Sequence, residues 1–237
     1  MESTAARISK RLEALASPEA AQFAQRFFKT GAGEYGEGDL FRGIRVPLLR
    51  KLSVSLDDAP LPEIIQLLSS PWHEDRLLAL LLLMRRFKRG REVDQEEIYN
   101  LYLAHTRHIN NWDLVDISAP HIVGRFLEYR DRSVLYKLVN SCSLWERRIA
   151  ILSTMHFIRQ GEFTDTILLA EMLLQDKEEL LHKATGWMLR ELGKRDPAAL
   201  EGFLSKHFRT MPRVMLRYAI ERFPEEKRQQ YLKGHCT

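Results

Sequence analysis

Residues 76–84 read RLLALLLLM, and later stretches repeat this frame, in which a small residue lies among apolar neighbours. The later frames are WDLVDISA at 112–119, RRIAILSTM at 147–155, KATGWMLRE at 183–191 and the stretch around Ala219. The central residues, Ala79, Val115, Ala150, Gly186 and Ala219, are 36, 35, 36 and 33 residues apart. A period of this length is typical of solenoids in which each repeat is one pair of helices.

Helical patterns also fill the segments between the frames, at 96–105, 133–140 and 163–174. Helix starts are predicted at Ser17-Pro18, Ser70-Pro71 and Asp196-Pro197, because proline suits the first helical position. Pro120 predicts a helix boundary at Ala119. The segment 31–43, GAGEYGEGDLFRG, is predicted to be a long loop, since it lacks the Gly-Lys-Ser/Thr ending of a phosphate-binding loop.

These patterns predict an all-α fold, an α-α superhelix of stacked helix pairs with one concave face. We expect a single domain over 1–237, with N-terminal helices and the glycine-rich loop in 1–60 and repeats over about 61–237. A non-repetitive helical bundle is the alternative.

Composition excludes several classes of protein. The 237 residues are 45% hydrophobic, and the longest apolar run, Leu77–Met84, is too short to cross a bilayer. Two cysteines cannot build a disulfide framework or a cysteine zinc site, which favours a cytoplasmic compartment. We expect Cys142 to be a packed thiol. The pair His105 and His108 has no evident third ligand, so no metal site is predicted. The net charge of +4 permits an anionic partner.

The helical register predicts a stripe of cations and aromatic rings across successive repeats. Its members are Arg76, Trp112, Asp116, Arg148, Lys183, Trp187, Arg190 and Arg217. Cations interleaved with aromatic rings suit a nucleic-acid groove. A lone carboxylate there disfavours binding of a polyanion, and so suggests chemistry that develops positive charge, such as glycosidic cleavage. The alternatives are a solvated basic face, core tryptophans and a carboxylate in a structural salt bridge.

Four strings carry a resemblance to a known family. They are FFKTGAGEYGEGDLFRGIRVPLLRKL (27–52), NNWDLVDISAPHIVG (110–124), LWERRIAIL (144–152) and HKATGWMLRE (182–191). From about residue 7 to 225 the chain resembles the AlkD-like family of bacterial DNA alkylation repair glycosylases, which are built of HEAT-like repeats.

The resemblance implies roles for individual residues. Asp116 matches the catalytic aspartate, Trp112 and Trp187 match tryptophans that contact the lesion-bearing backbone, and Arg148 matches a phosphate-binding arginine. Phe27 takes the place of a tyrosine found in some members, which removes a hydroxyl and keeps an aromatic face. We expect further phosphate contacts from Arg45 and Arg50 in the N-terminal segment, together with Arg76, Lys183, Arg190 and Arg217.

The resemblance implies hydrolytic removal of cationic N3- or N7-alkylated purines from double-stranded DNA. We expect no cofactor, no metal, no strand-cleaving lyase step and no base-binding pocket, and we expect a monomer acting on bacterial DNA in the cytoplasm. Paralogues that bind branched DNA without catalysis provide one alternative. A helical-repeat scaffold for a protein partner is another.

Overall fold

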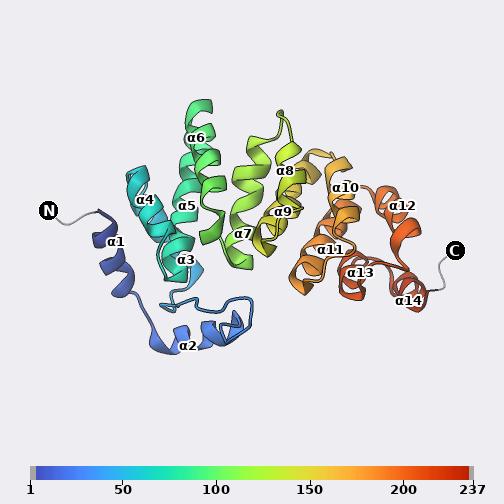
Figure 1. The fold of residues 1–237 in the computed structure, drawn as a ribbon, viewed down its shortest axis with the longest axis horizontal. Helices are drawn as coiled ribbons and strands as arrows, with labels where there is room; N and C mark the ends of the chain where they lie inside the picture. Colours follow the sequence, from blue (N-terminus) through green and yellow to red (C-terminus); the bar gives the residue numbers. More distant parts are fainter. Residues whose placement is uncertain (1–3, 235–237) are drawn as a thin grey trace. The chain divides into compact units, whose positions relative to one another are not determined.

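A computed structural model describes residues 4–234, and the described chain is helical, with a single isolated bridge between Leu40 and Trp72 (Figure 1). The predicted all-α helical-repeat fold is confirmed. The chain divides into two compact units, Met1–Leu114 and Val115–Thr237. The single-domain expectation stays a prediction.

The first unit contains the helices α1 to α6 and one 3-10 turn. They are α1 (Thr4–Glu13), α2 (Pro18–Phe27), α3 (Val46–Ser55), α4 (Leu61–Leu68), α5 (His73–Arg89), α6 (Glu92–Ala104) and the 3-10 turn η1 (Thr106–His108). The helix α7 (Trp112–Ala119) begins in this unit and continues into the second.

The second unit continues with the π-helical turn η2 and the C-terminal helices. They are η2 (Pro120–Gly124), α8 (Ser133–Leu138), α9 (Leu144–Gln160), α10 (Thr164–Met172), α11 (Glu179–Gly193), α12 (Pro197–His207), α13 (Arg213–Ala219) and α14 (Glu225–Lys233).

The repeated frames form every second helix, namely α5, α7, α9, α11 and α13. Their small central residues are buried, as the period predicts. In the second unit α9 packs against η2 and α11, and α11 packs against α13. Gly186 shows why a small residue is required, because a Cβ there would lie 2.4 Å from the Met215 carbonyl oxygen of α13.

In the first unit, α5 is the central helix, and α3, α4 and α6 pack around it. The predicted 31–43 loop is confirmed and is fixed to α5 by one buried carboxylate. Glu74 accepts hydrogen bonds from the backbone N–H groups of Arg42, Gly43 and Ile44, at 2.8, 2.7 and 3.1 Å. Gly43 has a φ of +76° and lies so close to α2 that a Cβ would clash with the Ser17 carbonyl. The loop therefore holds α2 near α5.

Helix boundaries follow the sequence signals in part. Ser17 and Asp196 cap α2 and α12, as predicted. The prediction at Ser70-Pro71 was wrong by two residues, because Ser70 instead accepts from the Trp72 backbone N–H and donates to Asp75, and α5 begins at His73.

Two further expectations require correction. The boundary predicted at Ala119 is present, since α7 ends there, but the reason was wrong: Ala119 keeps helical geometry, with φ −57° and ψ −45°, and Pro120 changes the helix type. Cys142 is exposed, because it lies in the short connection before α9 and not within a helix. Among the described residues, no helix is long and apolar enough to span a membrane.

Candidate functional site

A partly buried ion pair fixes the Asp116 carboxylate within the second unit. Arg148 Nε donates to Asp116 Oδ1 at 2.8 Å and Arg148 Nη2 donates to Asp116 Oδ2 at 2.9 Å. The remaining terminal nitrogen, Nη1, donates to the carbonyl of Leu180 at the start of α11. Arg148 is only 4% exposed, whereas the Asp116 side chain is 16% exposed. The two-point contact orients the carboxylate and leaves it accessible to water.

This geometry gives Arg148 different contacts from those expected. The guanidinium was expected to bind phosphate, but all three of its nitrogens donate to groups of the protein. Its neighbours Ile149 and Ala150 lie in the core, so α9 holds the guanidinium at a fixed depth beside Asp116. We therefore describe Arg148 as a positioning residue for Asp116.

Trp112 lies in the first unit, in a row of aromatic rings. Its ring stacks on Phe28, with centroids 5.3 Å apart and planes at 22°. Phe27 meets the Trp112 ring edge-on at 5.9 Å and is 55% exposed. The structure therefore brings together the two aromatic residues selected from the sequence, Phe27 and Trp112, and adds Phe28 between α2 and α7.

A buried histidine fixes the residues around Trp112, and sequence analysis missed it. His73 Nδ1 lies 2.9 Å from Asp39 Oδ2, and His73 Nε2 lies 2.8 Å from Asp113 Oδ2. Burial alone would lower the pKa of His73, but the hydrogen bonds and charges of these two carboxylates outweigh it and raise the pKa to about 9. His73 is therefore a cation at neutral pH, and both ring N–H groups donate.

Two further contacts connect this histidine to the helix that carries Trp112. Asn111 Nδ2 donates to Asp39 Oδ2 at 3.2 Å, and Asn111 Oδ1 accepts from the Trp112 backbone N–H at 2.8 Å. The sequence signal that could have revealed the cluster is the run HEDR at 73–76, since these four polar residues directly precede the longest apolar run of the chain. All four are buried.

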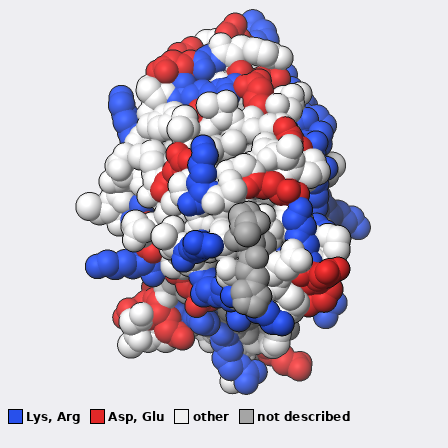
Figure 2. All heavy atoms as spheres, turned by 90° about the vertical axis from the view of Figure 1, so that its right-hand side faces the viewer, with Lys and Arg blue, Asp and Glu red and all other residues white. Residues whose placement is uncertain are grey.

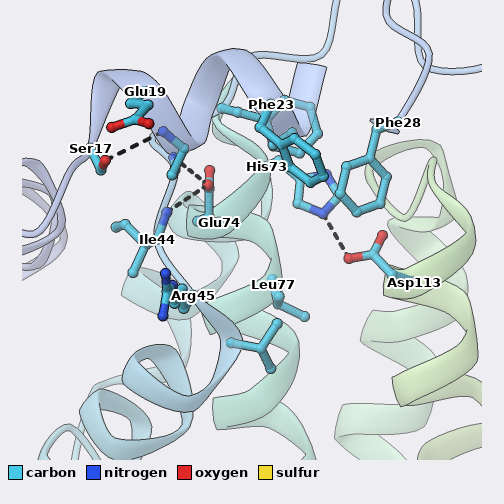
Figure 3. Close-up of a pocket in the computed structure, with 15 residues that line it drawn as sticks. Ser17, Glu19, Phe23, Phe28, Ile44, Arg45, His73, Glu74, Leu77 and Asp113 are labelled. Carbon is cyan, nitrogen blue, oxygen red and sulfur yellow. Dashed lines mark hydrogen bonds and ion pairs between the residues drawn. The ribbon is translucent and has the colours of Figure 1, made fainter. Parts of the chain in front are cut away.

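A cavity of about 590 Å³ lies beside this cluster, entirely within the first unit. Phe23, Phe28 and Phe41 line it together with His73 and Asp113 (Figure 3). The sequence does not predict this cavity, because the residues that line it come from segments far apart along the chain, chiefly α2, the 31–45 segment, α5 and the start of α7.

Trp187 lies in the second unit on α11 and is half-buried. Its indole N–H donates to Glu191 Oε1 at 3.2 Å. Burial favours a higher pKa for Glu191, but the hydrogen bond and charge of Lys194, with Arg190 nearby, lower the pKa below its ordinary value. Trp187 lines a small cavity of about 240 Å³ with Met155 and Arg159. Its ring is thus fixed beside charged groups at a solvent-accessible edge.

The cations predicted to contact phosphate fall into three groups, namely exposed side chains, side chains paired with a carboxylate, and buried side chains. Arg45, Arg50 and Arg217 are exposed. Lys183 pairs with Glu179 on its own helix at 2.5 Å, and Arg190 pairs with Glu221.

Arg76 departs most from the expectation. It is 4% exposed, and its Nη2 donates to Asp39 Oδ1 at 2.6 Å. Such placement makes it part of the His73 cluster and not an exposed phosphate contact. On the face drawn in Figure 2, Lys and Arg side chains are interspersed with Asp and Glu. Among residues 4–234, no group of three His, Cys, Asp or Glu side chains could hold a metal ion.

The sequence model of the family described as DNA alkylation repair enzyme matches residues 8–223, nearly the whole chain. The chain belongs to the DNA alkylation repair enzyme family. Membership in this family implies a role in alkylation repair, with DNA as the substrate. None of the curated proteins compared with the chain matches it.

Two solved structures share the fold of this chain at low sequence identity. A predicted DNA alkylation repair enzyme from Enterococcus faecalis has a TM-score of 0.67 at 17% identity, over 89% of this chain and 97% of that one. The protein smu.31 from Streptococcus mutans UA159 has a TM-score of 0.51 at 18% identity, over 93% and 98%. At these identities the likeness concerns the fold alone.

Proposed function

We propose that this DNA alkylation repair enzyme is an AlkD-like monofunctional glycosylase. It hydrolyses the N-glycosidic bond of cationic N3- or N7-alkylated purines in double-stranded DNA, as a monomer and without metal or cofactor. Its cellular place is the bacterial cytoplasm, at the nucleoid. The observation that carries the proposal is the Asp116 carboxylate, oriented by Arg148 and still reached by solvent.

The chemistry follows from charge. An alkylated purine already carries a positive charge, so it can leave without protonation by a general acid. As the bond to C1′ breaks, its electron pair neutralises the purine, and positive charge develops on the deoxyribose. Asp116 stabilises that sugar and orients the water that adds to C1′, and the proton of the water departs through the carboxylate.

Trp112 and Asp116 are four residues apart in α7, so both side chains project from the same side of this helix. An indole ring supplies an apolar surface for the sugar, and Phe28 and Phe27 hold that ring in place. The backbone around the lesion is bound by Trp112 and Trp187 in this proposal. Exposed arginines, Arg45, Arg50 and Arg217, contact the phosphates.

The decisive experiment is incubation with duplex DNA that contains a single N7-methylguanine, followed by chromatography for the free base. Release of 7-methylguanine, with an intact strand that breaks only after alkaline treatment, supports a monofunctional glycosylase. Binding of the duplex without base release refutes catalysis and favours a non-catalytic DNA-binding protein. Absence of salt-dependent DNA binding refutes both and leaves a scaffold for a protein partner.

A further inference from the structure

Trp112 is the first residue of α7, and this end of a helix is weakly held by the helix itself. The backbone N–H groups of the first turn have no partner within the helix, so helix ends fray unless other groups bind them. In the proposed hydrolysis Trp112 must present its ring to the sugar at a defined place, because a misplacement of about 1 Å can cost about 100-fold in rate. The groups that hold Trp112 therefore matter for the reaction.

Polar contacts of His73 hold the residues on both sides of Trp112. His73 Nε2 donates to Oδ2 of Asp113, the next residue of α7, at 2.8 Å (Figure 3). On the other side, His73 Nδ1 donates to Asp39 Oδ2, and the same oxygen accepts from Asn111 Nδ2. The Asn111 side chain in turn accepts from the backbone N–H of Trp112. One imidazole thus anchors the chain before and after Trp112.

A stack of aromatic rings connects His73 with the Trp112 ring itself. The centroid of the imidazole lies 4.9 Å from that of Phe28 and 4.6 Å from that of Phe41. The rings of Phe28 and Phe41 stack on each other at 5.0 Å with planes at 18°. Phe28 then stacks on Trp112 at 5.3 Å. Ring pairs at such distances attract each other, so Trp112 rests on a ring whose own place is set by His73.

Burial makes His73 a rigid support. His73 is 2% exposed and Asn111 is fully buried, whereas Trp112 is only half-buried. A buried cation whose two N–H groups both donate to carboxylates cannot turn without breaking a charged hydrogen bond. The contacts of the preceding two paragraphs therefore form an unbroken path from an immobile buried group to a partly exposed ring.

We propose that His73 is a positioning residue for the hydrolysis, which it supports by holding the Trp112 ring in the orientation that receives the sugar. Being buried, His73 contacts neither the phosphates nor the reacting atoms, and it acts through Asn111, Asp113 and Phe28. The inference rests on the proposed function for the role of Trp112 in the reaction. The placement of the ring, however, can be measured without any substrate.

Fluorine NMR measures that placement. The chain contains four tryptophans, so protein labelled with 5-fluorotryptophan gives one resonance for each, and Trp112→Phe identifies that of Trp112. We expect His73→Gln to shift or broaden the Trp112 resonance, because glutamine has no ring to stack on Phe28 and no charge for the two carboxylates. The resonances of Trp145 and Trp187 should stay unchanged. An unchanged Trp112 resonance in His73→Gln overturns the proposal.

A double-mutant cycle connects the ring with the reaction. Single-turnover release of 7-methylguanine is measured for His73→Gln, for Trp112→Ala and for the double variant. We expect His73→Gln to lower the rate by about 10–100-fold and to leave the affinity for undamaged duplex nearly unchanged. Because His73 acts through Trp112, the double variant should excise at the rate of Trp112→Ala alone. Rate losses that multiply in the double variant overturn the proposal, since His73 would then act by another route.

Two further variants control for a general loss of folding. Ile98→Ala removes a fully buried side chain from α6, which packs against α5, and should lower Tm while leaving the Trp112 resonance and excision per folded molecule unchanged. A Trp112 resonance that moves as far in Ile98→Ala as in His73→Gln also overturns the proposal. If His73→Gln does not fold, Asn111→Ala replaces it with the same criteria, since it cuts the polar connection to Trp112 and keeps every charge paired.

The glycosylase and the positioning role can fail separately. No release of 7-methylguanine by the unaltered protein refutes the glycosylase, and the fluorine spectra still decide whether His73 holds Trp112. Release of 7-methylguanine by the unaltered protein, together with a Trp112 resonance that is the same in His73→Gln, refutes the positioning role alone.

Discussion

Replacement of Asp116 by asparagine should separate catalysis from stability when it is compared with a matched substitution. In the unaltered protein, Asp116 binds two nitrogens of Arg148 through its two oxygens. Asparagine keeps one oxygen for Arg148 and turns an NH2 group towards the other nitrogen, so one charged hydrogen bond and the ion pair are lost. We expect a cost of about 1.5–3 kcal/mol in the free energy of unfolding.

The same substitution removes the charge that stabilises the sugar in the transition state. Loss of one such group typically lowers a rate by about 10²–10³, or roughly 3–4 kcal/mol in activation free energy. DNA affinity should stay equal or rise slightly, because a negative charge that repels the phosphates disappears. The stability cost corresponds to a fall in Tm of about 3–12 °C, so excision must be measured well below the lowered Tm.

The matched control is Asp176→Asn. Asp176 accepts from the neighbouring arginine of α9, Arg147, at 2.7 Å from Nε and 3.5 Å from Nη2, and its side chain is 9% exposed. This control should lower Tm to a similar extent and leave excision unchanged. Single-turnover release of 7-methylguanine, thermal unfolding and anisotropy are measured on both variants. If Asp116→Asn excises as fast per folded molecule as Asp176→Asn, the carboxylate is structural and the catalytic assignment is refuted.

Three further predictions concern packing, pH and the DNA footprint. Gly186→Ala should lower the free energy of unfolding by about 1–3 kcal/mol, because the added methyl group would meet the backbone of α13. Gly202→Ala, whose methyl group would have no neighbour within 4 Å, should leave the free energy of unfolding unchanged or raise it by up to about 1 kcal/mol. Equal free energies of unfolding for the two variants in chemical denaturation would contradict this prediction. The pKa of His73 is raised from 6.5 to about 9, so its contribution to stability is complete below pH 6.5 and is lost as the pH rises to about 9. The free energy of unfolding of the unaltered protein should fall by about 3 kcal/mol over this window, and that of His73→Gln should fall by less. Parallel plots of Tm against pH for the two proteins would show that His73 is not the group responsible. Arg217→Glu should weaken DNA binding and reduce the salt slope by about one. Arg76→Gln should lower Tm and leave the slope unchanged, and a changed slope for Arg76→Gln would return that residue to the footprint.

The sequence by itself determined the helical-repeat fold and the candidates on the frame helices. The period of about 35 residues is visible because every second helix must bury a small residue against its neighbour, as Gly186 does against α13. Local signals also located the caps at Ser17 and Asp196, since a cap depends on residues within one turn. Asp116, Trp112 and Trp187 could be selected because charged and aromatic residues at helical spacing share a face.

Tertiary structure alone decided what these side chains contact. Nothing in the register shows that Arg148 holds Asp116 or that Arg76 is buried against Asp39, because both contacts join residues more than 30 positions apart. The same reason hid His73, whose two carboxylates come from the glycine-rich loop and from α7. Periodicity predicts which face of a helix is buried. The partner of a buried charge depends on which distant backbone the fold brings beside it, and only the packed chain fixes that.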